Sequence, residues 1–208
     1  SKSRIAYGSA AFAKGGREIY FTSDQGSEFL QLKKLDLVTG KVTNLTPGIH
    51  WDVESMAVTR DRSKLAFSVN DNGMSELYEL DTRTNKPHKL KGIPPATISD
   101  LSWNSDDRTL GFSMNSAKGA DTYSYDVVAG KLKRWTFSET GGLNANTFQD
   151  FKLVKWKSFD GLDLSGWLMM PPAKFKGPRP VWIEIHGGPE DESRPGFIGP
   201  YNYFVNEM

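Results

Sequence analysis

A short apolar run near the end of the chain is followed by His186, Gly187, Gly188 and Pro189. Residues of these types could form a turn that takes part in acyl-transfer chemistry. In acyl transfer the carbonyl oxygen gains negative charge, and one backbone N–H aimed at it typically contributes about 2.7–4 kcal/mol. A backbone N–H approaches a substrate only where no bulky side chain intervenes, which two glycines directly after a strand allow. Pro189 has no N–H and cannot donate. The two glycines thus suit a turn that presents a backbone N–H to a substrate.

Arg194 carries a positive charge shortly after this turn, in the run E-S-R-P-G-F. One interpretation is that its guanidinium binds a carboxylate or carbonyl of a peptide near the glycines. The other, which we favour, is a salt bridge with Glu190, Asp191 or Glu192 that fixes the loop.

Other residue types exclude several kinds of chemistry. The three histidines are scattered without metal-ligand spacing, and we expect His50 and His88 to be surface residues. Cysteine is absent, which excludes disulfides, thiol catalysis and Cys-based zinc sites. We therefore expect no metal and no cofactor. Trp167 and Trp182 are predicted to be core residues, and Asp160 to cap a turn.

The composition is that of a globular chain. Of 208 residues, 38% are hydrophobic, 25% are charged and 12% are aromatic, which suits a core built from β-strands. The net charge of +1 gives no electrostatic reason to bind nucleic acid or an anionic membrane. No apolar run approaches the length of a membrane-spanning helix. Cytoplasmic, periplasmic and secreted locations are all compatible with these features.

An internal repeat of about 45 residues precedes the turn. Three kinds of position recur in each unit: an aromatic in a short apolar segment, an aspartate before a turn, and a large apolar residue after it. These are Phe21, Phe67 and Phe112; Asp36, Asp81 and Asp126; and Leu45, Leu90 and Trp135. Short segments rich in β-branched and aromatic residues, separated by turn residues, predict four strands per unit. Such a unit is one blade of a β-propeller.

Turn residues mark the hairpins inside each unit. Gly40, Asn85 and Gly130 occupy one matching place, and both residue types tolerate a positive φ. Gln25-Gly26 and Asn72-Gly73 mark a second turn, between the second and third strands. The repeated aspartates are expected to bond backbone amides of the turn rather than a ligand.

The repeat stops after residue 136, and the composition changes. We predict a partial propeller over residues 1–140, a polar linker over 141–149 and a second domain over 150–208. In the second domain, the runs 151–159 and 164–171 form a predicted hairpin around Asp160-Gly161. A third predicted strand, 180–186, leads into the His-Gly-Gly-Pro turn, and Glu184 places it near a sheet edge or beside a polar partner.

These motifs resemble those of the prolyl oligopeptidase family of serine peptidases, in its acylaminoacyl-peptidase and dipeptidyl-peptidase-like branch. The blades carry F-S-x-x and L-D-x-x-T-G-K patterns, which are also similar to TolB propellers. The later motifs are S-F-D-G at 158–161, G-W-L at 166–168 and the run from Pro180 to Pro189. The resemblance implies a mainly β fold, with about three four-stranded β-propeller blades followed by the first strands of an α/β-hydrolase domain.

The resemblance also implies roles for the residues of the turn. Gly188 would supply one N–H of the oxyanion hole, Gly187 would shape the turn and His186 would hold the loop by hydrogen bonds. Hydrolase triads run Ser, Asp, His along the chain, so His186 comes too early to be the catalytic base. G-x-S-x-G is absent from the 208 residues, and we therefore expect this chain alone to be inactive.

The implied partners are peptide substrates and the remaining part of the same protein, namely further blades and the hydrolase core; a homo-oligomer is also compatible. Two other functions stay open. One is a non-enzymatic TolB-like β-propeller that binds proteins, with residues 150–208 as an accessory. The other is an H-G-G-G-type esterase, against which the propeller argues because those esterases normally carry cap helices.

Overall fold

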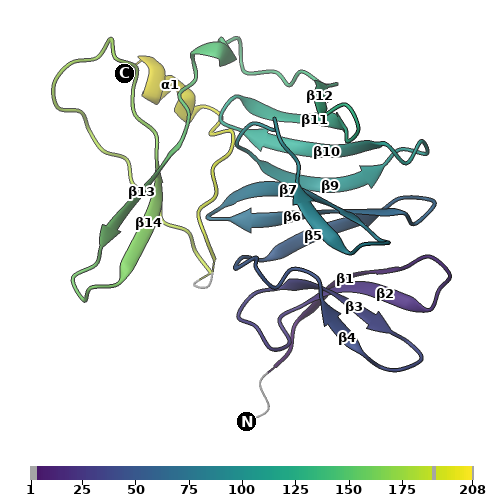
Figure 1. The fold of residues 1–208 in the computed structure, drawn as a ribbon. Helices are drawn as coiled ribbons and strands as arrows, with labels where there is room; N and C mark the ends of the chain where they lie inside the picture. The colour runs from purple at the N-terminus through teal and green to yellow at the C-terminus, as the bar shows by residue number, and fades with distance from the viewer. Residues whose placement is uncertain (1–3, 189–190, 208) are drawn as a thin grey trace.

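A computed structural model describes residues 4–188 and 191–207. Figure 1 shows three antiparallel sheets stacked side by side, with a separate hairpin and a short helix beside them. The chain is mainly β, and the four-stranded sheets have the form of propeller blades. This architecture confirms the predicted blades.

The strands of each blade follow one another across the sheet in chain order. Blade 1 contains β1 Tyr7–Phe12, β2 Glu18–Ser23, β3 Gln31–Asp36 and β4 Val42–Asn44. Blade 2 contains β5 Val53–Val58, β6 Lys64–Asp71, β7 Met74–Asp81 and β8 Lys86–Lys89. Blade 3 contains β9 Thr97–Trp103, β10 Thr109–Ser116, β11 Gly119–Asp126 and β12 Lys131–Arg134. The first strands of successive blades, which are end strands of their sheets, lie next to one another along one edge of the stack.

The hairpin turns have the backbone conformations that their residue types predict. Gly40, Asn85 and Gly130 have φ values of +71°, +54° and +63°. In the other turn, Asn72 and Gly73 also have positive φ. Glycine adopts this region at no steric cost, and asparagine adopts it more readily than other residues, so local sequence fixes where each hairpin reverses.

The repeated aspartates cap these turns. Asp36 Oδ1 accepts hydrogen bonds from the backbone N–H groups of Val38 and Thr39, at 2.8 and 3.0 Å. Asp126 Oδ1 accepts equivalent bonds from Val128 and Ala129. Asp81 does the same in blade 2. The prediction that these carboxylates bond backbone amides is therefore confirmed.

Asp126 provides a pH-dependent contribution to stability. Hydrogen bonds from the Arg108 side chain and from the Ala129 backbone lower its pKa from 3.8 to about 2. A carboxylate with a lowered pKa in the folded state stabilises that state above its unfolded pKa and loses the effect as the pH falls through its folded pKa. We expect the free energy of unfolding to fall between pH 4 and pH 2, and to fall less in Asp126→Asn. Chemical denaturation at several pH values measures this, and equal pH dependence in both proteins would contradict it.

Apolar side chains fill the two spaces between successive blades. Between blades 1 and 2, the core includes Tyr20, Leu32 and Phe67, and Leu45 closes its edge. Between blades 2 and 3, the core includes residues such as Leu77, Leu90, Leu110, Phe112 and Met114. Phe67 and Phe112 thus each face the preceding blade, which explains why an aromatic recurs at this position of the repeat in blades 2 and 3.

The residue that pairs with the repeated phenylalanine across the strands is a tyrosine in blades 2 and 3 but a lysine in blade 1. Phe67 stacks on Tyr78 and Phe112 on Tyr123, with ring centroids 5.2 and 6.5 Å apart. Lys33 occupies the corresponding place in blade 1, where it pairs with Phe21 across the strands. Burial lowers the pKa of Lys33, with an opposing contribution from the Asp24 charge.

Trp135, in blade 3, is more exposed than the residues at the same repeat position in blades 1 and 2. Its counterparts Leu45 and Leu90 are buried between blades, whereas Trp135 is 56% exposed. Its indole N–H donates to Ser124 Oγ at 2.8 Å, and Lys133 Nζ lies 3.6 Å from the ring centroid. The tryptophan therefore lies on a face of blade 3 that no described blade covers.

The chain continues from blade 3 into a connection, a hairpin and a helix. The predicted linker contains a short 3-10 helix, Ala145–Thr147, followed by the buried Phe148. Strands β13 Lys152–Lys157 and β14 Asp163–Leu168 pair with each other and, within 4–188 and 191–207, with no other strand. Gly161 has φ +88°, and Asp160 Oδ1 accepts from Leu162 N at 3.2 Å, so the predicted hairpin and its cap are confirmed. Helix α1 spans Tyr201–Glu207.

The predicted third strand over 180–186 is wrong for this structure. These residues form no strand, and Val181, Trp182, Ile183 and Ile185 are 75–82% exposed. A strand needs a neighbour that accepts and donates its backbone hydrogen bonds, and no described segment pairs with this one. The described residues accordingly contain only the β13–β14 hairpin of the expected hydrolase strands.

In the part of the chain that the structure describes, no helix has the length and apolar character to cross a membrane.

Candidate functional site

The His-Gly-Gly-Pro turn is described as far as Gly188. Gly188 has φ +133°, a backbone conformation that residues other than glycine rarely adopt, whereas Gly187 has no positive φ. His186 Nδ1 lies 3.1 Å from the carbonyl oxygen of Gly187 and donates to it, so this histidine contacts its own loop. Pro189 lies outside the described residues. The positive φ at position 188 therefore explains why this residue is a glycine.

The amides of this turn are not used by their own loop within the described residues. Neither Gly187 nor Gly188 donates a backbone hydrogen bond there. A methyl group added at Gly187 would have no neighbour within 4 Å, so the turn is open on that side. Exposed and unbonded amides are what an oxyanion-binding turn needs before substrate arrives.

Arg194 makes the most extensive polar contacts at this end of the chain. Its Nη1 lies 2.5 Å from Glu54 Oε1, and its Nε lies 3.6 Å from Glu192 Oε1. Of the three acids proposed as partners, Glu192 is confirmed, Asp191 shows no such pair, and Glu190 lies outside the described residues. The stronger partner, Glu54, lies in β5 of blade 2. Sequence reasoning missed it because the two residues are 140 positions apart.

The structure agrees with the predicted surface positions of the two other histidines but not with the predicted burial of Trp182. His50 and His88 are exposed, as predicted, and His88 lies in β8. Trp167 is half-buried, and its indole nitrogen would lie 3.0 Å from a Cβ added at Gly73. The prediction that Trp182 belongs to the core is wrong: it is exposed and packs on Tyr201 of α1 with ring centroids 5.4 Å apart. Its segment lacks the neighbouring strand that would bury it.

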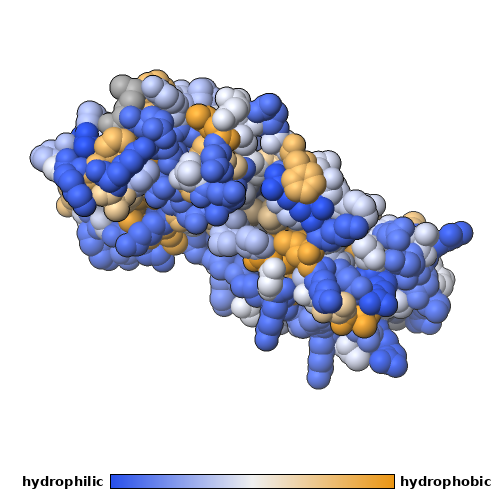
Figure 2. Space-filling view, turned by 90° about the horizontal axis from the view of Figure 1, so that it is seen from above, coloured by the Kyte–Doolittle hydropathy of each residue, from blue (hydrophilic) through white to orange (hydrophobic). Residues whose placement is uncertain are grey.

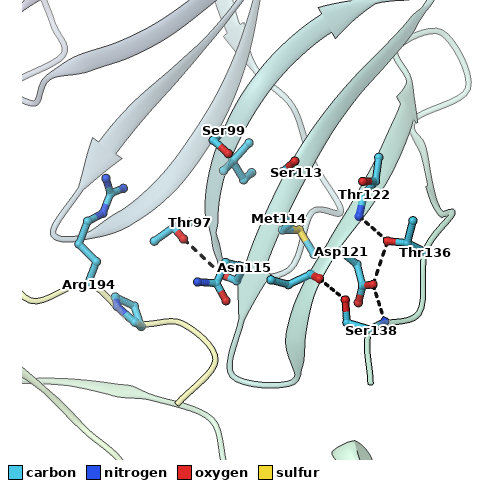
Figure 3. A pocket seen from close by; sticks show the side chains of 13 residues that line it. Thr97, Ser99, Ser113, Met114, Asn115, Asp121, Thr122, Thr136, Ser138 and Arg194 are labelled. Carbon is cyan, nitrogen blue, oxygen red and sulfur yellow. Dashed lines mark hydrogen bonds between the residues drawn. The ribbon is translucent and has the colours of Figure 1, made fainter. Parts of the chain in front are cut away.

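A cavity of about 720 Å³ lies between blade 3 and the segment after the turn. Figure 3 shows side chains from β9, β10 and β11 around it, with Arg194 on one side. Polar and apolar groups share its lining, and the hydroxyl and amide groups come from Thr97, Ser99, Ser113, Asn115, Thr122, Thr136 and Ser138. Figure 2 shows the upper surface of the molecule as largely hydrophilic with separate hydrophobic patches.

Asp121 is the buried charge of this cavity. Its carboxylate accepts hydrogen bonds from Thr136 Oγ1 and Ser138 N, and Arg134 Nη2 lies 2.5 Å away. Burial acts to raise the pKa of Asp121, but these hydrogen bonds and the Arg134 charge outweigh it, so the pKa lies below its usual value. A carboxylate already paired in this way supports the blade rather than offering a free charge to a ligand.

The stacked four-stranded blades, with a glycine turn after a β-hairpin, give a fold that a puromycin hydrolase and a prolyl endopeptidase share, which confirms the predicted resemblance. No family model matches the chain. In sequence it is similar to dipeptidyl aminopeptidase BIII of Pseudoxanthomonas mexicana, with 26% identity over 199 residues, covering 91% of this chain and 29% of that protein.

Two solved structures show the same fold. The crystal structure of a puromycin hydrolase matches with a TM-score of 0.75 and 18% identity, over 97% of this chain and 32% of that one. A prolyl endopeptidase structure matches with a TM-score of 0.63 and 16% identity, over 80% and 24%. The chain thus spans about a third or less of the length of these proteins.

Proposed function

We propose that the chain is part of a serine peptidase of the prolyl oligopeptidase family that hydrolyses short peptides. In this proposal a serine hydroxyl attacks the peptide carbonyl, the amine leaves, and water then hydrolyses the acyl-enzyme. Gly188 N–H stabilises the oxyanion formed in each step. The Ser, Asp and His of the triad lie outside these 208 residues, because G-x-S-x-G is absent from them.

The observation that supports this proposal most is the conformation of Gly188, with its positive φ and with no hydrogen bond from its amide among the described residues. The match to the puromycin hydrolase fold covers 97% of the chain and so extends beyond the blades into residues 150–208. The blades would lie beside the glycine turn and would admit only small or unfolded peptides to it.

An assay with aminoacyl and acyl-aminoacyl anilides tests the proposal. The natural protein that contains this sequence is expected to release the aniline and to lose this activity after treatment with a fluorophosphonate, which reacts with an activated serine. The 208-residue chain alone is expected to show no turnover. Turnover by the chain alone, or an inactive natural protein that lacks G-x-S-x-G followed by Asp and His, would contradict the proposal.

One observation favours the alternative of a protein-binding propeller. Residues 180–186 form no strand, and the described residues after 150 contain no sheet larger than a hairpin. In that case the natural protein would contain no G-x-S-x-G, and residues 180–186 would be protected from hydrogen exchange only when a protein partner is bound. Protection of this segment in the natural protein alone would favour the peptidase.

A further inference from the structure

The residues that follow the turn, 191–197, form an extended segment that we call the strap. It connects the His-Gly-Gly-Pro loop with the turn before α1, and Figure 1 shows it beside the ends of blades 2 and 3. Pro195 is buried, although none of residues 191–197 lies in a helix or a strand. Its position therefore depends on contacts with the blades rather than on its own backbone hydrogen bonds.

Arg194 fixes the middle of the strap to three parts of blade 2. Its Nη1 lies 2.5 Å from Glu54 Oε1 in β5. Its Nε donates to the carbonyl of Gly73 at 3.1 Å, in the turn between β6 and β7, and its Nη2 donates to Ser75 Oγ in β7 at 3.2 Å. Both charged side chains are only 28% exposed, so the pair is weakly screened by solvent.

Two asparagines at one position of the repeat hold the ends of the strap. Asn70 and Asn115 are 45 residues apart, and each is the penultimate residue of the second strand of its blade. Asn70 Nδ2 donates to Glu192 Oε1, and Asn115 Oδ1 accepts from Phe197 N at 2.8 Å. The strap thus crosses two blades and uses the same repeat position on both.

Close packing completes the contact at Asn115. A Cβ added at Gly196 would lie 2.6 Å from Asn115 Nδ2, so a larger residue here would have to displace the Asn115 side chain. The ring of Phe197 lies 6.0 Å from that of the buried Phe148, which follows the short 3-10 helix. The end of the strap therefore packs against the connection as well as against blade 3.

We propose that Glu54, Asn70 and Asn115 are positioning residues, which dock the strap on the blades and thereby hold the Gly188 amide in place for catalysis. This proposal rests on the proposed peptidase function. Gly188 and Arg194 are six positions apart in the chain, a distance of at most about 22 Å even when fully extended. Because the strap continues the turn along the chain, we expect a displaced strap to displace the turn, and a misplacement of about 1 Å can lower a rate by about a hundredfold.

Steady-state kinetics of the natural protein tests the proposal. Glu54→Gln and Asn115→Ala are each expected to lower kcat by about tenfold or more while changing KM by less than about twofold, because the turn loses its place without losing substrate contacts. Asn115→Asp keeps an acceptor for Phe197 N and is expected to restore most of kcat. A residue with a purely structural role would instead lower the amount of folded protein and leave kcat of the folded fraction unchanged.

Glu18→Gln is the matched control. Glu18 pairs with Lys34 at 2.9 Å on blade 1, and both side chains are also partly buried, but neither contacts the strap. Its loss is expected to leave kcat unchanged. Hydrogen exchange of the 208-residue chain gives a second readout: residues 191–197 are expected to exchange faster in Glu54→Gln and Asn115→Ala than in Glu18→Gln.

The two proposals fail in different ways. An unchanged kcat in both Glu54→Gln and Asn115→Ala, or a rise in KM alone, would overturn the positioning role while leaving the peptidase intact. Unchanged exchange of residues 191–197 would overturn the docking itself. An inactive natural protein would overturn the proposed function, and the catalytic role of the strap with it.

Discussion

Replacing Phe67 by alanine is expected to lower the free energy of unfolding by about 3–5 kcal/mol, the usual cost of removing a buried phenylalanine. Phe67 is fully buried between blades 1 and 2, and its ring stacks on Tyr78 with an interplanar angle of 10°. The substitution leaves a cavity that the two stiff sheets cannot close. Urea denaturation of the 208-residue chain measures the loss, and a chain of this size should also lose about 2–4 °C in Tm per kcal/mol.

Phe21→Ala is the matched control, because Phe21 holds the same repeat position in blade 1. Its ring contacts Tyr7 at 6.2 Å, and Tyr7 is itself 64% exposed on a face that no described blade covers. Less burial means a smaller loss, of about 1 kcal/mol. Equal losses for Phe21→Ala and Phe67→Ala would show that the face of blade 1 is covered in solution.

Replacing Gly188 by proline is expected to lower kcat of the natural protein by about 10²–10³-fold, because one donor to the oxyanion is removed. KM should change much less, since the donor acts mainly on charge that develops in the transition state. The measurement is anilide hydrolysis by purified variants whose Tm values are also compared.

Gly188→Ala separates the lost donor from the altered backbone. Alanine keeps the N–H but is strained at φ +133°, so its kcat should lie between those of the wild type and Gly188→Pro. Equal losses in the two variants would assign the effect to backbone strain. An unchanged kcat in Gly188→Pro would place the donor at another residue.

The propeller could be predicted because its determinants are local and repeated. Each hairpin is specified by a positive-φ residue such as Gly40 or Asn85, and by an aspartate that bonds the amides of the turn. The register of each sheet is set by alternating apolar residues, and three copies of the pattern reinforce the same interpretation.

Segment 180–186 and the strap could not be predicted in the same way. The alternation of Val181, Ile183 and Ile185 is suited to a strand, but a strand forms only where a partner supplies hydrogen bonds, and none of the described segments does. The partner of Arg194 was sought among neighbouring acids, whereas Glu54 lies in a blade 140 residues earlier. The one sequence feature that indicates where the strap contacts the blades is the asparagine that recurs after 45 residues, at Asn70 and Asn115.

The sequence by itself determined the four-stranded repeat, its turns and the glycine turn after it, because short-range sterics and hydrogen bonds decide these features within a few residues. Only the tertiary structure decided that Glu54, Asn70 and Asn115 meet the strap, and that Trp182 stays exposed. Those outcomes depend on which distant segments the stacked blades bring together, and which neighbours a segment lacks, and neither is encoded in any local pattern.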